Sequence, residues 1–284
     1  MSDNSLSDNS LSDHSLSAYF HRIGYTRTPR ADLATLAELQ ARHVRAIPFE
    51  GLDPLVGRPV KLDLPALEAK LIASRRGGYC FEHSVLFKAV LERIGFAVTG
   101  LTGRVRWMSP PDSPLSPREH MLLAVEADGA ARLVDVGFGA CLVDEPLLFA
   151  ADVEQPTALG TFRLTAANGL FHLAARQPAG WRTMYVFDMV PQIQADYELG
   201  NWYTSTSPNV PFLHILILER LAADRRHKLI ADRYIIEGRD GERLEEHPIE
   251  SADQLERVLE DVFGITPPVP AADLFARAAA APRA

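Results

Sequence analysis

The chain has few cysteines: Cys80 and Cys141 are the only two among its 284 residues. Because they form no Cys-x-x-Cys pair, they supply neither a disulfide framework nor the several soft ligands of a zinc site. Free thiols are typical of proteins in the reducing cytosol. We therefore expect a cytoplasmic protein without a bound metal.

Long apolar runs and an excess of positive charge are also absent. No uninterrupted apolar run reaches the roughly 20 residues of a membrane-spanning helix, and the N-terminus lacks the basic start and apolar core of a signal peptide. The 29 lysines and arginines against 37 aspartates and glutamates give a net charge of −8. This balance argues against nucleic acid or an anionic membrane as a partner, although a local basic pocket can still hold an anionic cofactor.

The order of patterns along the chain predicts four regions. Residues 1–16 repeat Ser-Asp-Asn-Ser-Leu in a polar, low-complexity tail that cannot bury enough apolar surface to become ordered. Residues 17–95 carry apolar side chains at helical spacing, as over 32–45. A strand-rich region over 96–200 and a mixed region over 201–284 follow.

Beyond Gly95 the hydrophobic pattern changes from helical spacing to alternation, which predicts strands. Turn signals at Asp128-Gly129 and Asn168-Gly169 separate several of these strands. Short successive strands of this kind indicate an antiparallel barrel or sandwich. The last region is expected to hold strands over 212–218, 229–236 and 243–247 and a closing helix over 252–263.

The segment Arg75-Arg76-Gly77-Gly78-Tyr79-Cys80-Phe81-Glu82 places a cysteine after a glycine-rich turn and before a helix expected over Phe81–Ile94. Nearby positive charge and a helix N-terminus both favour the thiolate form of a cysteine. Cys80 is therefore a candidate nucleophile. The alternative is a buried structural cysteine, which is the usual state of a free thiol.

A nucleophilic cysteine needs a base, and the base needs an orienting partner. If Asp128-Gly129 forms the centre of a hairpin, His120 falls opposite Gly137. Asp135 then lies on the same face of the sheet, at a diagonal position within reach of the His120 side chain. The sequence therefore predicts His120 as the base and Asp135 as its partner.

One other histidine and the second cysteine also have to be considered for the site. His83 is a rival base because it shares a helix face with Cys80, but the N-terminus of a helix disfavours a charged histidine. His120 is therefore preferred. Cys141, which follows the predicted hairpin, is interpreted as a structural cysteine.

Together these segments resemble the arylamine N-acetyltransferase family. The cysteine segment resembles the active-site signature of that family, and four further segments match it in order from about Ser17 to the last helix. They are Ile47-Pro48-Phe49-Glu50, His120-Met121, Val134-Asp135-Val136-Gly137-Phe138-Gly139 and Asn201-Trp202-Tyr203-Thr204-Ser205-Thr206-Ser207-Pro208.

The resemblance implies an α+β fold with a helical first domain, an antiparallel β-barrel second domain and an α/β third domain that acts as a lid. The core would resemble that of the cysteine proteases, with Cys80, His120 and Asp135 as a catalytic triad. Glu50 and Arg76 would form a structural ion pair. The implied activity is a ping-pong transfer of an acetyl group from acetyl-CoA, through an acetyl-cysteine, to an arylamine, arylhydrazine or N-hydroxyarylamine.

The same resemblance implies which residues contact the two substrates. The aromatic acceptor would lie against three phenylalanines, namely Phe81, Phe138 and Phe212. CoA, entering as the co-substrate acetyl-CoA, would contact Gly137, Gly139, Tyr203, Thr206, Ser207 and Asn209. The enzyme would be a monomer or a homodimer.

Two positions depart from the pattern of the family. Ser84 replaces a common asparagine, and Gly51 stands where a larger polar residue is usual. Neither is a member of the implied triad, so the departures affect local hydrogen bonding rather than the chemistry. Three other functions remain open: an amide synthase of macrocycle biosynthesis, a papain- or transglutaminase-like hydrolase, and a non-catalytic binding protein.

Overall fold

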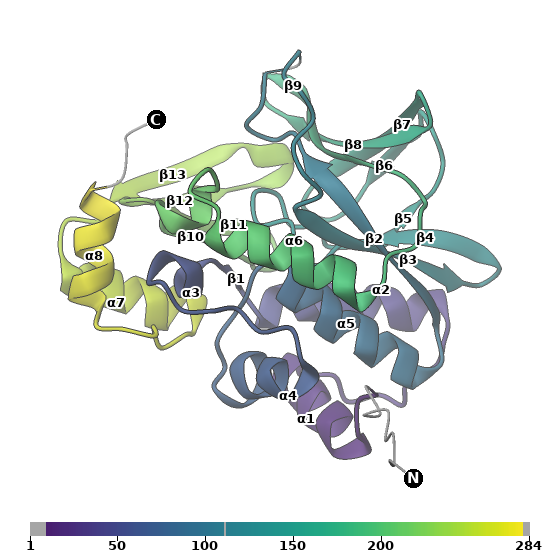
Figure 1. Cartoon of the computed structure of the whole chain (residues 1–284), viewed down its shortest axis with the longest axis horizontal. Coiled ribbons are helices and arrows are strands. Elements are labelled where there is room, and N and C mark those ends of the chain that lie inside the picture. Colours follow the sequence, from purple (N-terminus) through teal and green to yellow (C-terminus); the bar gives the residue numbers. More distant parts are fainter. Residues whose placement is uncertain (1–9, 111, 281–284) are drawn as a thin grey trace, which may run out of the picture.

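The computed structural model describes residues 10–110 and 112–280 of the chain. It has the predicted α+β fold, and most helices of the N-terminal part lie below the strands in the view of Figure 1. The elements of this part are α1 (Asp13–Ile23), α2 (Leu33–Ala46), β1 (Phe49–Glu50), α3 (Leu52–Leu55), α4 (Leu64–Leu67), the π-helical segment η1 (Glu68–Ala73) and α5 (Cys80–Ile94).

The first helix begins earlier than the sequence predicts. Ser12 caps α1 by accepting a hydrogen bond from a backbone N–H three residues later, and Leu11 is buried in the core. The predicted tail of residues 1–16 is therefore wrong from Asp13 onward, because the leucine and the serine of the repeat supply a core contact and a helix cap. Its first nine residues lie outside the described part of the chain.

Eight antiparallel strands form a nearly closed barrel (Figure 1). Their spatial order is β5-β4-β3-β2-β9-β8-β7-β6. The strands are β2 (Ala97–Val105), β3 (His120–Ala127), β4 (Ala130–Val134), β5 (Leu147–Leu148), β6 (Glu154–Pro156), β7 (Thr161–Ala167), β8 (Leu170–Gln177) and β9 (Gly180–Phe187). The sequence pattern did not reveal β9, which pairs with both β2 and β8.

A second sheet of five antiparallel strands has the order β1-β10-β11-β12-β13. Because β1 belongs to the N-terminal part, this sheet joins that part to the C-terminal strands through the pairing of Phe49 with Glu219. Helix α6 crosses the centre of the view in Figure 1 between the two sheets. The remaining elements are α6 (Gln194–Thr206), the 3₁₀ turn η2 (Pro211–Leu213), β10 (Ile217–Leu221), β11 (Arg226–Ile230), β12 (Arg233–Glu237), the 3₁₀ turn η3 (Arg239–Gly241), β13 (Arg243–Pro248), α7 (Ala252–Arg257), the π-helical η4 (Val258–Phe263) and α8 (Ala271–Ala280).

Three expectations for this region were wrong. The single strand expected over 229–236 is a hairpin, because Ala231 takes a positive φ of 51° in a turn between β11 and β12. The strand expected over 212–218 begins only at Ile217, after the turn η2. The helix expected over 252–263 is not the last one, because α8 follows it and packs against α7.

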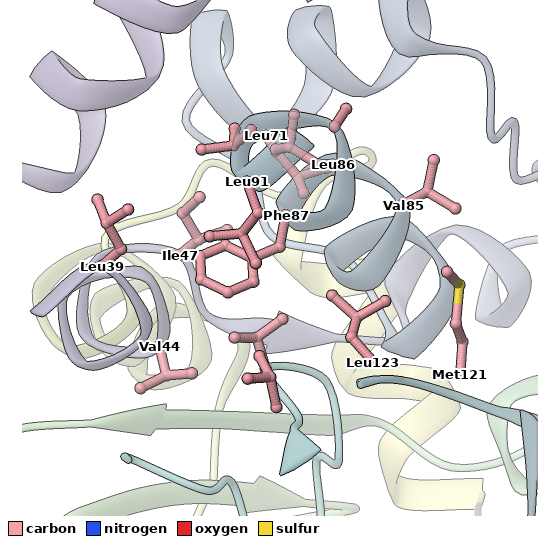
Figure 2. Close-up of a cluster of buried hydrophobic side chains, with 14 of the residues drawn as sticks. Leu39, Val44, Ile47, Leu71, Val85, Leu86, Phe87, Leu91, Met121 and Leu123 are labelled. Carbon is pink, nitrogen blue, oxygen red and sulfur yellow. The ribbon is translucent and has the colours of Figure 1, made fainter. Parts of the chain in front are cut away.

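Three clusters of buried apolar side chains underlie these layers. The first surrounds α5, where Phe87 packs among Leu39, Ile47 and Leu91 (Figure 2). The second fills the barrel, and the third lies between the five-stranded sheet and the C-terminal helices. The first cluster fixes the helix that begins with Cys80, while the predicted division into domains at residues 95 and 200 stays a prediction.

The core around α5 yields a stability prediction. Phe87→Ala should lower the free energy of unfolding by about 3–5 kcal/mol, because the fully buried ring leaves a cavity that its neighbours cannot fill. The control is Leu244→Ala on β13, where the side chain is 48% exposed and the expected change is below about 0.5 kcal/mol. Urea unfolding measures both, and equal effects would contradict the assignment of Phe87 to the core.

Candidate active site

Cys80 is the first residue of α5, so its thiol lies at the positive end of the helix dipole. The backbone N–H of Tyr79 donates to the Glu82 Oε2 atom at 3.0 Å, which fixes the entry into the helix. Only 4% of Cys80 is exposed, and its Sγ atom lies 3.6 Å from the carbonyl oxygen of Glu119. The predicted presentation of the cysteine by a helix N-terminus is confirmed.

The hairpin of β3 and β4 brings His120 and Asp135 together. Asp128 and Gly129 both take positive φ values, 50° and 75°, and Leu123 pairs with Val134. These are the turn and register that the sequence predicts. His120 begins β3, Asp135 follows β4, and the Nε2–H group of His120 donates to the Asp135 Oδ2 atom at 2.8 Å.

The side chain of Asp135 is fully buried, and its carboxylate accepts three hydrogen bonds from described residues. Besides His120, the hydroxyl group of Tyr185 on β9 donates to Oδ2 at 2.8 Å, and the backbone N–H of Gly137 donates to Oδ1 at 2.9 Å. Burial alone would raise the pKa of Asp135, but the charge of His120 and these donors bring it below its ordinary value. The carboxylate is therefore ionised in the folded protein. Tyr185 was missed because it lies on the strand that the pattern did not reveal.

The charge on Asp135 in turn holds a proton on His120. Burial lowers the pKa of the imidazole, but the Asp135 carboxylate and the neighbouring Cys80 thiol raise it overall to about 10. Because Nε2 is engaged by Asp135, Nδ1 is the ring nitrogen left for the thiol. A charged imidazole beside a sulfur atom favours the thiolate, which is the nucleophilic form.

The rival base His83 is committed to a buried hydrogen-bond chain. Its Nε2–H group donates to the carbonyl oxygen of Pro48 at 3.2 Å, so its Nδ1 atom accepts from His43 at 2.7 Å. The Tyr19 hydroxyl group donates to the remaining nitrogen of His43 at 2.8 Å. Burial lowers the pKa of His83 to about 4, which leaves the ring neutral. Both nitrogens of His83 are therefore occupied, and this geometry favours His120 as the base.

A buried network of charges holds the loop that precedes Cys80. Arg76 contacts Glu50 at 2.5 Å, the pair implied by the resemblance, and also Asp53 at 3.2 Å. Lys70 contacts the other oxygen of Asp53 at 2.6 Å and Glu82 at 2.7 Å. Burial raises the pKa of the Glu82 carboxyl to about 7, although the ammonium group of Lys70 opposes this shift. Sequence reasoning missed Asp53, Lys70 and Glu82 because no short motif joins them.

The two glycines predicted to contact CoA lie against the protein itself. A Cβ atom on Gly137 would lie 2.6 Å from the Cα atom of Cys80, and one on Gly139 would collide with the ring of Phe49. The absence of side chains at these positions lets the catalytic hairpin pack on the cysteine helix and on β1. Contact of either glycine with CoA stays a prediction.

The three phenylalanines predicted to bind the acceptor differ in their surroundings. Phe138 presents its ring nearly perpendicular to the His120 imidazole, with the ring centres 5.2 Å apart. Phe212 is half-buried in η2 and contacts the ring of Tyr79. Phe81 is fully buried and packs against Gly200 of α6. Of the three, Phe138 contacts a member of the triad, whereas Phe81 and Phe212 both contact the ring of Tyr79, the residue before Cys80. Contact of any of the three with the acceptor stays a prediction.

The end of α6 reaches the junction of the cysteine and the histidine. The Thr204 hydroxyl group donates to the carbonyl oxygen of Glu119 at 3.5 Å, the same oxygen that Cys80 approaches. Four of the predicted CoA contacts flank Thr204 in the sequence, and their contact with CoA stays a prediction. Tyr203 and Ser207 are half-buried, and Thr206 and Asn209 are exposed.

Neither a metal centre nor a membrane span is found in the part of the chain that the structure describes. Among those residues, no group of three or more His, Cys, Asp and Glu side chains is placed to hold a metal ion. No helix of the described ranges is long and apolar enough to cross a membrane.

The fold and the Cys-His-Asp arrangement define a class of protein that comparison with known families identifies. Residues 32–270 match the model of a family described as N-acetyltransferase, and the chain belongs to this family. The resemblance seen in the sequence is confirmed.

Particular relatives are arylamine N-acetyltransferases. That of Mycolicibacterium smegmatis is 44% identical over 214 residues, which cover 74% of this chain and 78% of the relative. The structure of the Salmonella typhimurium enzyme has a TM-score of 0.87 at 34% identity and covers 94% of this chain and 98% of its own. The structure of the Mycobacterium marinum enzyme, solved in complex with CoA, has a TM-score of 0.85 at 37% identity, with coverage of 93% and 97%.

The buried charge network predicts a large effect of Lys70→Met. The substitution leaves Asp53 and Glu82 without their shared cation, so the free energy of unfolding should fall by about 3–5 kcal/mol. Lys88→Met is the matched control, because Lys88 forms an exposed ion pair with Glu92 within α5. This substitution should lower the free energy of unfolding by less than about 1 kcal/mol. Equal midpoints of urea unfolding for the two variants would refute the role given to Lys70.

The charged state of His120 predicts the pH dependence of thiol reactivity. The pKa of the His120 imidazole is about 10, so the ring is charged at pH 6.5. Because a charged imidazole favours a reactive thiolate beside it, iodoacetamide should alkylate Cys80 readily at this pH. In His120→Ala the rate at pH 6.5 should be at least about tenfold lower and should rise toward pH 9, where free thiols ionise. Intact-mass kinetics measure both rates, and Cys80→Ala corrects for any reaction of Cys141. Identical rates at pH 6.5 would contradict the pairing.

Proposed function

We propose that the protein transfers the acetyl group of acetyl-CoA to the nitrogen of arylamines or arylhydrazines, or to N-hydroxyarylamines, through an acetyl-Cys80 intermediate. The observation that carries this proposal is the sulfur of Cys80 at a helix N-terminus beside an imidazole that a buried carboxylate keeps charged. Membership of the N-acetyltransferase family supports the same reaction. The geometry of Cys80, His120 and Asp135 supports the roles that the proposal gives them.

In the first half-reaction the thiolate of Cys80 attacks the thioester carbonyl carbon of acetyl-CoA. A new carbon–sulfur bond forms, and the carbonyl oxygen becomes an oxyanion that backbone N–H groups at the start of α5 are suited to stabilise. The bond to the CoA sulfur then breaks, and the leaving thiolate takes the proton of the His120 imidazolium. Acetyl-Cys80, free CoA and a neutral His120 remain.

In the second half-reaction the amine nitrogen attacks the acetyl group on Cys80. Aromatic amines are weak bases, so their lone pair is free near neutral pH. The neutral His120 accepts the proton that the nitrogen loses, and the bond to the Cys80 sulfur breaks. The products are the acetylated amine and the original thiolate–imidazolium pair, so the cycle closes without any other reactant.

Asp135 and Tyr185 act by holding the imidazole. The hydrogen bond from Nε2 to Asp135 fixes the tautomer and the plane of the ring, and Tyr185 fixes the carboxylate from its other side. The charge of Asp135 stabilises the imidazolium that exists before the first half-reaction and after the second. Asp135 keeps its own charge throughout.

The two substrates would approach from different elements. The ring of Phe138, set edge-on to His120, is suited to an aromatic acceptor, and Phe212 borders the same region from η2. The end of α6 carries Tyr203, Thr206 and Ser207, whose hydroxyl groups are suited to the polar groups of CoA. The link of Thr204 to Glu119 supports this assignment, because it ties the end of α6 to the position of the reacting sulfur.

The covalent intermediate provides the test of the proposed function. After mixing with acetyl-CoA alone, the intact mass should rise by one acetyl group, located on Cys80 by peptide mapping. Cys80→Ala should show no increase, and addition of an arylamine should return the wild-type mass to its original value. A wild-type protein that stays unmodified by acetyl-CoA would overturn the proposal.

A further inference from the structure

The backbone conformation at position 51 does not require a glycine. Its φ of −109° and ψ of 33° lie outside the left-handed region, so an L-residue can adopt them. A Cβ atom built there would nevertheless lie 2.7 Å from the Cδ1 atom of Phe212, closer than such atoms approach in proteins. The requirement for glycine is therefore one of space, and the ring of Phe212 uses that space.

The backbone at Gly51 is held on both sides. Its N–H donates to the carbonyl oxygen of Ile217 on β10 at 3.1 Å, and the N–H of Leu52 donates to the Glu50 carboxylate at 2.8 Å. A side chain at position 51 therefore has to displace the ring rather than the main chain. Phe212 is free to respond, because it is half-buried in a short turn between α6 and β10.

Two other aromatic rings confine the ring of Phe212. The ring of Tyr79, the residue before Cys80, meets it nearly at right angles with centres 5.6 Å apart. The ring of Phe49 lies 6.0 Å from it and fills the space beside Gly139. With the main chain of Gly51 on a third side, a displaced Phe212 ring moves toward its exposed side.

We propose that Gly51 is a specificity-determining residue, which selects aromatic acceptors with a second ring or a bulky substituent by setting where the Phe212 ring lies. The inference rests on the proposed function, in which Phe212 borders the path of the acceptor to acetyl-Cys80. Access to that sulfur is narrow, because only 4% of Cys80 is exposed. A ring pushed outward narrows the path further, and this penalises a two-ring amine more than a single-ring amine.

The test compares kcat/KM for aniline and 4-phenylaniline, with acetyl-CoA as donor. In Gly51→Ala the ratio of 4-phenylaniline to aniline should fall about tenfold relative to wild type, the scale of discrimination that one misplaced apolar group produces. Gly238→Ala is the matched control, since its φ is −87° and its added Cβ would make an ordinary contact at 3.4 Å with Leu244 on β13. Its ratio should equal that of wild type.

The variant Phe212→Ala shows whether Gly51 acts through the ring. Removal of the ring should raise the ratio, and the added change Gly51→Ala should then leave it unaltered, because no ring remains to be displaced. A ratio that Phe212→Ala does not change would overturn the inference even if Gly51→Ala failed to fold. The inference would also be overturned if Gly51→Ala lowered the ratio equally in the wild-type protein and in the Phe212→Ala variant.

Failure of this inference and failure of the proposed function give different results. If the proposed function is wrong, the wild-type protein forms no acetyl-Cys80 and acetylates neither amine. If only the inference is wrong, the wild-type protein acetylates the amines, and either Gly51→Ala keeps the wild-type ratio or its effect on the ratio does not depend on Phe212.

Discussion

One fully buried carboxylate, that of Asp135, sets the conditions that the rest of the site has to meet. A buried charge without partners is costly, and each carboxylate oxygen needs donors to replace water. The fold supplies them from three places: His120 at the start of β3, Tyr185 on β9 and the backbone N–H of Gly137 just after the hairpin strand. The barrel thereby makes the charge tolerable, and the charge then fixes a proton on the imidazole. The pairing of the barrel strands therefore keeps Asp135 ionised, and the charge of Asp135 keeps His120 protonated beside the sulfur of Cys80.

A second set of buried charges positions the helix α5 and the loop before it, and so the sulfur of Cys80. Glu82 closes the N-terminus of α5, Lys70 joins Glu82 to Asp53, and Asp53 joins the Glu50–Arg76 pair. This network ties η1, α3 and β1 to the helix, and β1 is also part of the five-stranded sheet. A glycine at position 137 lets the two halves approach until its backbone touches that of Cys80. Cys80 belongs to the hydrophobic cluster around α5, while the imidazole of His120 packs against Phe138 and Tyr185 of the barrel cluster.

The features that sequence reasoning predicted are those set by local rules. The Asp128-Gly129 turn fixes the register of β3 and β4, so the approach of His120 to Asp135 followed from counting residues. The features it missed depend on contacts distant in sequence. Tyr185 lies 50 residues from Asp135, on a strand whose alternation was too weak to recognise. Lys70 reaches Glu82 only because η1 lies beside α5 in three dimensions, and the tail boundary failed because a leucine of the repeat found a core contact.

The residues that carry charge and protons are separate from the aromatic residues that would contact the acceptor. Such a site can therefore change its preference for acceptors without losing its reaction. The groups that move protons are buried, hydrogen-bonded and fixed by two networks, so a substitution among them leaves charges unpaired. Phe212 belongs to neither network. It contacts Tyr79 and Phe49 only through ring faces and edges, and it lies on a turn of three residues between α6 and β10. A residue that displaces this ring alters the shape presented to an aromatic amine, while the hydrogen bonds of Asp135 and the charges around Glu82 keep their partners. We therefore expect the choice of acceptor to vary through Gly51 and Phe212, whereas a change in the triad geometry would remove the reaction itself.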